Sequence, residues 1–453
     1  MSLFKKKVLV IGLGKSGLSV TRWLSGEGAE VTVSEMKEKA VIDNHLVSEI
    51  LDLGVKLETG GHKQATFLAS DMIVVSPGIP LDIEPLAISR EKGIPVLGEM
   101  ELAGRLIDIP LVAITGTNGK STTTSLVGSM IKNAGFSVFV GGNIGTPLMD
   151  YVTGEQNAEF AVVEVSSFQL DTIEKFCPIV SLLLNISPDH LDRYSNYEAY
   201  VQSKLKIFQN QGPGQYAILN DEDEVLSHLD LSRGISVLRY GMREKKNRHA
   251  FIEGEKMIAF LPEMEPQEFD IERYRLPGVH NLENLMAGVL TGLVLKIEPA
   301  VIQNTIEHFT SLSHRLELVR RISGVTFYDD SKATNVNAAL SSINSFDGPI
   351  ILIAGGRHKG GDYSPLADAA KGRVRKAILL GESKKILAKA FEGLVPFTMA
   401  ESMTDAVTQA FSSAEKDDVV LLAPACSSFD MFSDYVQRGT VFREAVERLR
   451  DGG

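Results

Sequence analysis

The chain has 453 residues, of which 44% are apolar and 23% are charged, so it has ample material for a folded core and is not expected to be disordered. Its 46 Lys and Arg residues and 58 Asp and Glu residues give a formal net charge of −12, which argues against non-specific nucleic-acid binding. At about 150 residues per domain, the length predicts three domains.

The cysteines and the N-terminus both favour a cytoplasmic protein. Cys177 and Cys426 cannot build a disulfide framework and suit a reducing compartment. The apolar run at residues 8–11 stops at Gly12, and no small-residue cleavage site follows it. We therefore expect a first strand there rather than a signal peptide. The apolar stretch at residues 285–295 is too short for a membrane-spanning helix of about 20 residues, so no membrane span is expected.

Apolar runs rich in β-forming residues alternate with helical patterns along the chain. Strands are expected at residues 8–11, 30–34, 72–76, 111–115, 161–165, 180–185, 350–354, 377–380 and 419–422, and helices at residues 122–134, 280–295 and 404–413. This alternation is typical of an α/β fold with mainly parallel sheets. The polar, irregular stretch at residues 239–275 predicts a small antiparallel insertion. We expect three sections, at residues 1–99, 100–310 and 311–453.

The first motif is Gly-Leu-Gly-Lys-Ser-Gly at residues 12–17, between an expected strand and a helix. Glycines in this position let a diphosphate approach a helix N-terminus, and Glu35 ends the next strand, where a ribose or base contact is expected. A nicotinamide dehydrogenase, a glycine turn used only for packing and a non-redox nucleotide diphosphate site all remain open.

The second motif, Gly-Thr-Asn-Gly-Lys-Ser-Thr at residues 116–122, follows a strand that is apolar almost throughout. It predicts a phosphate loop, in which backbone N–H groups face the phosphates, Lys120 reaches the terminal ones and Ser121 can ligate Mg²⁺. Its two glycines are separated by two residues instead of the four of the general phosphate loop. We therefore expect the chain to bind a nucleoside triphosphate. This argues against a dehydrogenase, because hydride transfer needs no phosphate loop.

Polar residues after later strands complete the candidate site. Glu164 and His190 have the chemistry of metal ligands, and they follow two expected strands. Lys204 lies in a helical segment, and its composition alone predicts a surface lysine. Four further loops rich in polar and small residues follow apolar strands or adjoin them, at residues 313–315, 329–335, 355–362 and 424–430.

Taken in order, these motifs resemble the Mur ligase family of ATP-dependent, amide-forming enzymes of peptidoglycan precursor synthesis. The resemblance covers the whole chain and rests on residues 116–122, 164–169, 185–190, 280–284, 314–315 and 329–334. It implies three α/β domains: a Rossmann-like UDP domain, a phosphate-loop ATPase domain and a C-terminal domain with a dinucleotide-type fold. The motif at residues 12–17 is similar to that in the UDP-binding domain of the members that add L-alanine or D-glutamate. The motifs at residues 116–122, 142–145 and 422–430 closely resemble those of the members that add D-glutamate to UDP-N-acetylmuramoyl-L-alanine.

The resemblance also implies roles for individual residues. The UDP substrate would be held by Gly14, Lys15, Ser16, Glu35, Ser76, Pro77, Gly78, Asn143, Ser166 and Gln169. ATP would be bound by Gly116, Thr117, Asn118, Gly119, Lys120, Ser121, Thr122, Asn281, Asn284, Arg315 and Asp330. D-glutamate would be bound by Lys332, Thr334, Lys359, Ser428, Phe429 and Tyr435. Glu35 stands where the family commonly has aspartate, and Phe429 and Tyr435 stand where its members vary.

The expected cofactors are two Mg²⁺ ions, with ATP as co-substrate. The resemblance implies that Ser121 and Glu164 hold one ion, and that His190 and Lys204 hold the other. Lys204 would act as a carbamate made from CO₂, which replaces the surface-lysine interpretation. Lys120, Glu164, His190 and Lys204 would form the catalytic set.

The expected reaction proceeds through an acyl phosphate and releases ADP and phosphate. We also expect a cytoplasmic monomer that binds no nucleic acid. The alternatives are a Mur-type ligase that uses another amino acid, a nicotinamide-dependent oxidoreductase, and a non-catalytic nucleotide-binding protein of wall synthesis.

Overall fold

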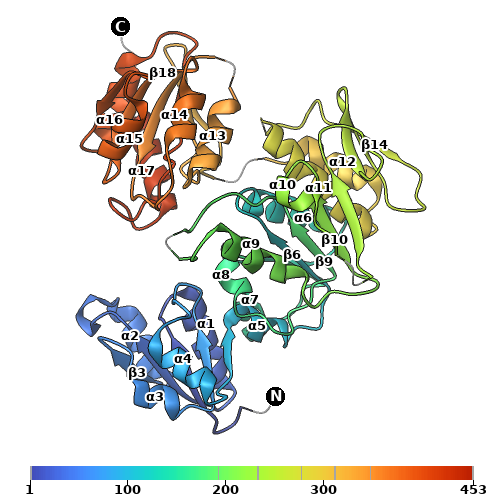
Figure 1. Cartoon of the computed structure of the whole chain (residues 1–453), viewed down its shortest axis with the longest axis vertical. Helices are drawn as coiled ribbons and strands as arrows, with labels where there is room; N and C mark the ends of the chain where they lie inside the picture. The colour runs from blue at the N-terminus through green and yellow to red at the C-terminus, as the bar shows by residue number, and fades with distance from the viewer. Residues whose placement is uncertain are drawn as a thin grey trace.

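The computed structural model describes residues 3–191, 193–231, 234–276, 278–310, 313–346 and 348–450. Within them, three sheets with helices around them follow one another along the chain (Figure 1), which confirms the expected α/β fold. Residue 311, where the third section is expected to begin, lies outside the described residues, as does residue 192. No helix in the described part of the chain combines the length and the apolar character that crossing a membrane requires.

The first sheet has five parallel strands in the order β3-β2-β1-β4-β5. Its strands are β1 (Lys7–Ile11), β2 (Glu30–Glu35), β3 (Lys56–Thr59), β4 (Met72–Val75) and β5 (Val96–Gly98). The helical segments are α1 (Lys15–Gly26), η1 (Lys39–Val41), α2 (Asn44–Asp52), α3 (Gln64–Leu68) and α4 (Glu84–Glu91). The strand order reverses beside β1, where open α/β sheets bind ligands at the carboxyl ends of their strands. The glycine motif directly follows β1 and therefore lies at this point.

The central sheet has nine strands in the order β14-β13-β12-β11-β10-β9-β6-β8-β7. They are β6 (Leu111–Thr115), β7 (Val138–Gly142), β8 (Phe160–Glu164), β9 (Val180–Leu183), β10 (Tyr216–Asn220), β11 (Ser236–Tyr240), β12 (Ala250–Glu253), β13 (Lys256–Ala259) and β14 (Gln267–Asp270). The expected insertion is antiparallel from β12 to β14, as predicted. It extends the edge of the central sheet, because β12 pairs in parallel with β11.

Helices cover both the central sheet and its junction with the first. They are α5 (Glu99–Gly104), α6 (Lys120–Asn133), α7 (Leu148–Thr153), α8 (Ser167–Leu170), α9 (Tyr197–Leu205), η2 (Lys206–Phe208), α10 (Glu224–Ser227), α11 (Val279–Val294) and α12 (Pro299–His308). The expected helix at residues 280–295 is α11, which packs against α6.

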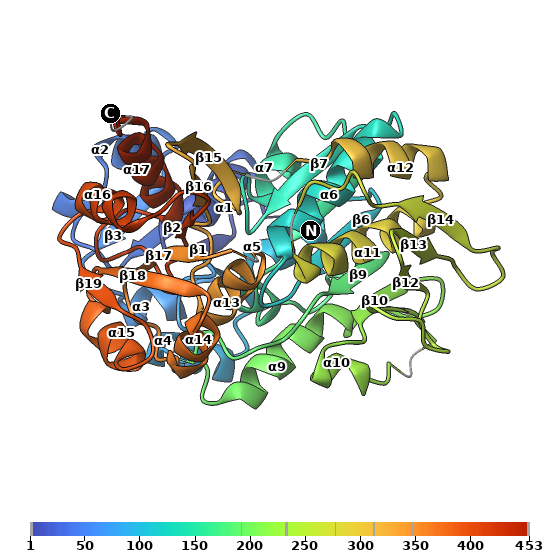
Figure 2. The ribbon, with the colours of Figure 1, turned by 90° about the horizontal axis from the view of Figure 1, so that it is seen from above.

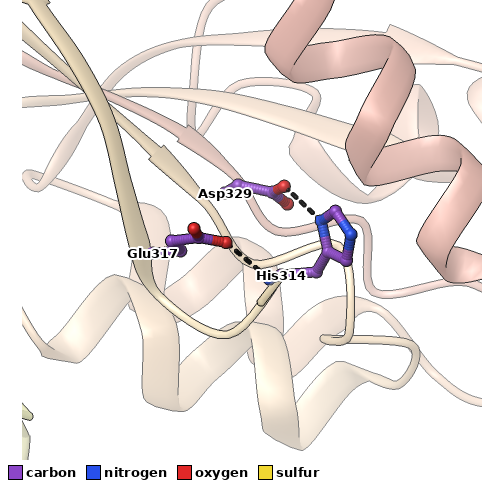
Figure 3. A group of neighbouring side chains, drawn as sticks. All are labelled: His314, Glu317 and Asp329. Atoms are coloured by element: carbon purple, nitrogen blue, oxygen red, sulfur yellow. Dashed lines mark hydrogen bonds and ion pairs between the residues drawn. The ribbon is translucent and has the colours of Figure 1, made fainter. Parts of the chain in front are cut away.

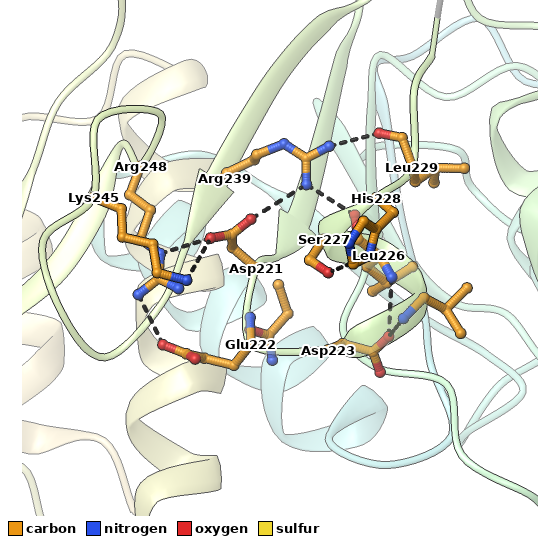
Figure 4. Close-up of polar contacts among 12 residues, drawn as sticks. Asp221, Glu222, Asp223, Leu226, Ser227, His228, Leu229, Arg239, Lys245 and Arg248 are labelled. Atoms are coloured by element: carbon orange, nitrogen blue, oxygen red, sulfur yellow. Dashed lines mark hydrogen bonds and ion pairs between the residues drawn. The ribbon is translucent and has the colours of Figure 1, made fainter.

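An ion-pair network holds the insertion to the end of β10 (Figure 4). The fully buried side chain of Arg248 lies with Nε 2.9 Å from Asp221 Oδ2 and Nη1 2.8 Å from Glu222 Oε1. Arg239 and Lys245 also approach Asp221, each at 3.6 Å. Because a buried guanidinium is costly without partners, these contacts favour a single placement of the insertion.

The third sheet has six strands in the order β15-β16-β20-β17-β18-β19, and only the edge strand β15 is antiparallel to its neighbour. Its strands are β15 (Glu317–Ile322), β16 (Val325–Asp329), β17 (Ile350–Gly355), β18 (Val374–Leu380), β19 (Phe397–Met399) and β20 (Val419–Leu422). The helices are α13 (Val336–Asn344), α14 (Ser364–Ala370), α15 (Lys384–Phe391), α16 (Met403–Ser413) and α17 (Tyr435–Glu447). Seen from above, α13 lies on the side of this unit that faces the central one (Figure 2).

All the expected strands are present, although some ends differ. The strand expected at residues 180–185 ends at Leu183, and the one expected at 377–380 begins at Val374. Short strands with polar residues, such as β3 and β19, were not expected. Both lie at sheet edges; β3, Lys-Leu-Glu-Thr, has one apolar residue, and β19, Phe-Thr-Met, is too short for its alternation to be recognised.

The apolar core is shared by two of the three units and is separate in the third. Leu18 and Trp23 of α1 belong to the same buried cluster as Met149 and Val152 of α7, so the first and central units share a core. The third unit has its own clusters on the two faces of its sheet.

Gly17 is predicted to be required for this fold. A Cβ there would lie 2.0 Å from Gly12 O and 2.9 Å from Ser76 Oγ, so Gly17→Ala forces α1 away from β1. We expect the free energy of unfolding to fall by about 1–3 kcal/mol, measured by chemical denaturation. Gly14→Ala is the control, because its Cβ meets no atom within 4 Å; it should cost less than about 1 kcal/mol, through the weaker helix cap. Equal effects would contradict the close-contact explanation.

Candidate functional site

The phosphate loop connects β6 to α6 and depends on two glycines with positive φ. Gly116 has φ 153° and Gly119 has φ 83°, and a Cβ on Gly119 would lie 2.2 Å from Asn284 Oδ1. Lys120 Nζ donates to the carbonyls of Gly116 and Thr117, each at 2.9 Å. Burial lowers the pKa of this amine below its usual value. The loop thus presents a cation and the N-terminus of α6, as an anion site requires.

Glu164 is at the centre of a polar group at the carboxyl ends of three strands. It accepts a hydrogen bond from Ser121 Oγ at 2.5 Å and another from Asn143 Nδ2 at 2.7 Å. Arg315 Nη2 donates to the same Ser121 Oγ at 3.1 Å. Burial alone would raise the pKa of Glu164, but Lys120 and Lys332, together with the hydrogen bonds from Ser121 and Asn143, hold the pKa below its usual range. An ionised carboxylate beside a hydroxyl fits the oxygen-ligand preference of Mg²⁺.

His190 and Asp189 lie in the loop after β9 and face the third unit. Burial lowers the pKa of His190 to about 4, so its ring is neutral at pH 7. The ring centroid lies 4.8 Å from that of Phe168. Asp189 accepts a hydrogen bond from Asn335 Nδ2 at 2.9 Å and lies 3.8 Å from Lys359 Nζ. A neutral imidazole is the form that can ligate a metal ion.

Lys204 is buried, so the prediction of a surface lysine from composition is wrong. It is only 1% exposed on α9, and its Nζ donates to the carbonyl of Gly116 at 2.9 Å. The amine also lies 4.7 Å from the centre of the Tyr200 ring. Burial and the nearby Lys120 lower its pKa well below the ordinary value for lysine. The helical pattern could not reveal this, because α9 packs beneath the phosphate loop.

A histidine–aspartate pair in the third unit directly precedes the ATP-site candidates Arg315 and Asp330 in the sequence; Figure 3 shows the pair with Glu317. His314 Nδ1 lies 2.7 Å from Asp329 Oδ2, and its backbone N–H donates to Glu317 Oε2 at 2.9 Å. Although these three side chains lie close enough to surround a cation, His314 and Asp329 already bond each other, and Glu317 accepts from the His314 backbone N–H and from Arg443. The pair therefore braces the neighbouring residues Arg315 and Asp330.

Burial shifts the pKa of both Asp330 and Lys332 toward neutral pH. Burial raises the pKa of Asp330 to about 6, although the Ser342 hydroxyl donates to its carboxylate. Burial, together with Arg315, lowers the pKa of Lys332 to about 8. The Lys332 amine lies 3.8 Å from the centre of the Tyr435 ring, a cation–π contact.

One cavity brings together most of the ATP candidates, half of the D-glutamate candidates and three of the four metal-site candidates. Among the predicted residues, those that line it are Thr117, Asn118, Gly119, Lys120, Ser121, Thr122, Asn143, Glu164, His190, Asn281, Asn284, Arg315, Asp330, Lys332, Thr334 and Lys359. Gly116, Lys204, Ser428, Phe429 and Tyr435 do not line it. Ser428 is buried and Phe429 is 62% exposed, so these two lie in very different surroundings.

The UDP-substrate candidates, apart from Asn143, lie away from this cavity. Gly14 caps α1, and Lys15 and Ser16 begin that helix. Glu35 accepts the backbone N–H of Leu13 at 2.8 Å, so its carboxylate holds the glycine motif.

The remaining UDP candidates lie at the junction of the first and central units. Ser76 Oγ donates to the Gly12 carbonyl at 3.0 Å, and Gly78 O accepts from Arg193 at 2.9 Å. Ser166 and Gln169 form the capping box of α8. Ser76, Pro77 and Gln169 line a second, narrow cavity.

Sequence reasoning gave no role of their own to four polar residues of the main cavity, although they lie in motifs or loops that it singled out. Asp189, Asn185 and Asn335 line the main cavity, and His280 joins them. Asp189 stands directly before His190 after a strand, which was the available signal. Asn335 caps α13 and would have been assigned to that role alone.

Three family models match successive parts of the chain. They are described as "Mur ligase MurD-like, N-terminal domain" at residues 6–98, "Mur ligase middle domain" at 114–292 and "Mur ligase, glutamate ligase domain" at 314–426. Curated relatives named UDP-N-acetylmuramoylalanine–D-glutamate ligase include one from Geotalea daltonii, 43% identical over 100% of this chain and 99% of its own. Another, from Citrifermentans bemidjiense, is 42% identical over 100% of both chains.

Solved structures share the fold at lower identity. A pseudomurein peptide ligase type C from Methanothermus fervidus has a TM-score of 0.62 and 19% identity, covering 98% of this chain and all of its own. The UDP-N-acetylmuramate–alanine ligase MurC from Thermotoga maritima has a TM-score of 0.61 and 18% identity, covering 98% of this chain and 99% of its own.

Proposed function

The chain belongs to the Mur ligase family, and we propose that it joins D-glutamate to UDP-N-acetylmuramoyl-L-alanine at the expense of ATP. The observation that carries the proposal is the single cavity in which the phosphate loop faces Lys332 and Lys359 of the third unit. Such a cavity brings a triphosphate and a small dianionic amino acid to one place. The full-length identity to relatives named for this reaction supports the same assignment.

The chemistry follows from the poor reactivity of a carboxylate. An oxygen of the L-alanine carboxylate attacks the γ-phosphorus of ATP, ADP leaves, and an acyl phosphate forms. The neutral amine of D-glutamate then attacks the carbonyl carbon, its nitrogen loses a proton, which phosphate or solvent accepts, and phosphate leaves from the tetrahedral intermediate. Because the first step brings two anions together, Lys120 and Arg315 would reduce their repulsion and stabilise the charge of the transferring phosphoryl group.

Two Mg²⁺ sites are part of the proposal. Ser121 and Glu164 would hold one ion, and His190 with a carbamate of Lys204 would hold the other. Their donor atoms fit: a carboxylate kept ionised, a neutral imidazole and a buried amine whose pKa is lowered. When bound, the ions would add positive charge against the phosphates.

Each of the three sections would bind a different part of the substrates. Residues 1–99 would bind the UDP part, residues 100–310 the triphosphate, and residues 311–453 the amino acid and the remaining side of ATP. In this arrangement Asn281, Asn284 and Asp330 lie along ATP. The expected cytoplasmic location and monomeric state remain part of this proposal.

Phosphate release measured across nucleotide-linked acceptors and D- or L-amino acids tests the function. We expect release only with ATP, UDP-N-acetylmuramoyl-L-alanine and D-glutamate together. Lys120→Ala should abolish release while calorimetry still detects binding of the UDP substrate, since that site uses other residues. Release with a different amino acid would favour another ligase of this family, and oxidation of a nicotinamide cofactor without phosphate release would favour the oxidoreductase.

We predict that Lys204 takes up CO₂. Its neutral amine attacks the carbon of CO₂ and loses a proton, which leaves a carbamate; ordinary lysine, with a pKa near 10.4, is protonated and cannot react. Protein supplied with ¹³C-labelled bicarbonate and Mg²⁺ should show a carbamate carbon signal that Lys204→Ala lacks. Lys206→Ala is the control, because that partly exposed lysine pairs with Asp171 at 3.2 Å. A signal that survives Lys204→Ala would contradict the assignment.

We predict that Lys359 holds a carboxylate of D-glutamate. Its amine borders the main cavity, where Asp189 at 3.8 Å is its present partner. Lys359→Ala should raise the KM for D-glutamate about 100-fold and change the KM for ATP less than about threefold, because a charged hydrogen bond is lost on one ligand only. Lys371→Ala, on an exposed lysine of the same unit, should change neither. An unchanged KM, or equal use of L-glutamate, would show that the pocket is wrongly assigned.

A further inference from the structure

Glu99 is an unusual residue at the junction of the first and central units. It begins α5 directly after β5 and is only 1% exposed. Its Oε1 accepts the backbone N–H of Met149, in the first turn of α7, at 2.8 Å. Its Oε2 is also buried and has no hydrogen-bond partner. A buried carboxylate oxygen without a partner is costly, so its retention requires an explanation.

The surroundings of Glu99 connect it to the proposed UDP-substrate site. The narrow cavity beside it is lined by Ser76 and Pro77 from the first unit and by Gln169 from the central unit, all candidates for binding that substrate. The cavity is about large enough for one water molecule. The junction is tightly packed, since a Cβ on Gly98 would lie 2.1 Å from Thr172 Oγ1.

The proposed UDP-substrate site has two halves: the start of α1 in the first unit, and the loop that carries Asn143 in the central unit. The helix that Glu99 contacts, α7, is connected to both. On one side, α7 packs against α1, whose first residues Lys15 and Ser16 are candidates for the diphosphate. On the other side, the loop at residues 142–147 runs directly into α7 and carries Asn143, which bonds Glu164 at 2.7 Å. A shift of α7 would therefore change the separation of Lys15 from Asn143.

We propose that Glu99 is a positioning residue: by tying α5 to the first turn of α7, it sets the spacing between the two halves of the UDP-substrate site. This inference rests on the proposed function, because it takes the UDP-linked sugar as the ligand that spans both halves. Uridine and diphosphate would use the first half alone, whereas the sugar and its L-alanine would need the second half as well.

The charge state of Glu99 is compatible with this role. Burial raises its pKa to about 7, although the backbone N–H groups of Met149 and Leu148 act in the opposite direction. A carboxyl group that is partly neutral repels a nearby diphosphate less than an ionised one does. Gln, which keeps the acceptor oxygen and is always neutral, should therefore replace Glu99 well.

Calorimetry with the full-length protein tests the inference by comparing UDP with UDP-N-acetylmuramoyl-L-alanine. Glu99→Ala should weaken binding of the UDP-sugar substrate at least about tenfold and leave binding of UDP within about twofold, whereas Glu99→Gln should bind both ligands as the unaltered protein does. Glu99→Met fills the space without an acceptor and replaces Glu99→Ala if the latter does not fold. A selective loss on the longer ligand is not expected from general destabilisation.

Glu101→Gln is the matched control on the same helix. Glu101 is fully buried, but its carboxylate accepts the backbone N–H groups of Glu174, Lys175 and Phe176 and pairs with Arg105, away from the narrow cavity. It should lower thermal stability without changing the ratio of the two affinities.

The inference is overturned if Glu99→Ala and Glu99→Met bind the UDP-sugar substrate as the unaltered protein does, or if they lose both ligands equally. If the unaltered protein itself fails to bind UDP-N-acetylmuramoyl-L-alanine, the proposed function fails first and the inference fails with it. The two failures are therefore distinguishable.

Discussion

The candidate site depends on cations that the fold holds close together in one cavity against their mutual repulsion. They gather there although the chain as a whole has a net charge of −12. Lys120, Lys332, Lys359 and Arg315 come from different elements. Burial lowers the pKa of Lys120 and of Lys332, and the charges of Arg315 and Lys359 lower both further. Glu164 offsets part of this charge within the cavity, and Asp189 does so beside Lys359. Such a cluster is preorganised for anions: bound phosphates and carboxylates would relieve a repulsion that the fold maintains without them.

The parallel sheets explain how these charged residues come together. Functional loops lie at the carboxyl ends of strands, and the phosphate loop, Glu164 and the His190 loop follow β6, β8 and β9, which are neighbours in the central sheet. In the third unit, Asp330 and Lys332 follow β16. The two sheets meet through these loops, because Arg315 reaches Ser121 and Asn335 reaches Asp189.

Much of the strand pattern and the phosphate loop could be predicted from the sequence, because both are local: continuous apolar runs and closely spaced glycines need no knowledge of distant contacts. Lys204 shows the limit of local reasoning. Its helix has an ordinary composition, and only the packing of α9 under the phosphate loop buries the amine. Asp189, Asn335 and Glu99 were given no role for the same reason, since their contacts join residues that are 50 or more positions apart.

The uneven division of the apolar core has a mechanical consequence. The first and central units share buried side chains, so separating them would expose apolar surface to water. The described contacts that join the third unit to the central cavity are polar, including Arg315 with Ser121 and Asn335 with Asp189, and water can replace such partners at little cost. The first and central units should therefore move little relative to each other, whereas the third unit can move more easily relative to the central one. A kosmotropic salt such as sulfate, which screens charges and strengthens apolar burial, would therefore weaken the charged contacts of the third unit with the central cavity and not the shared apolar core.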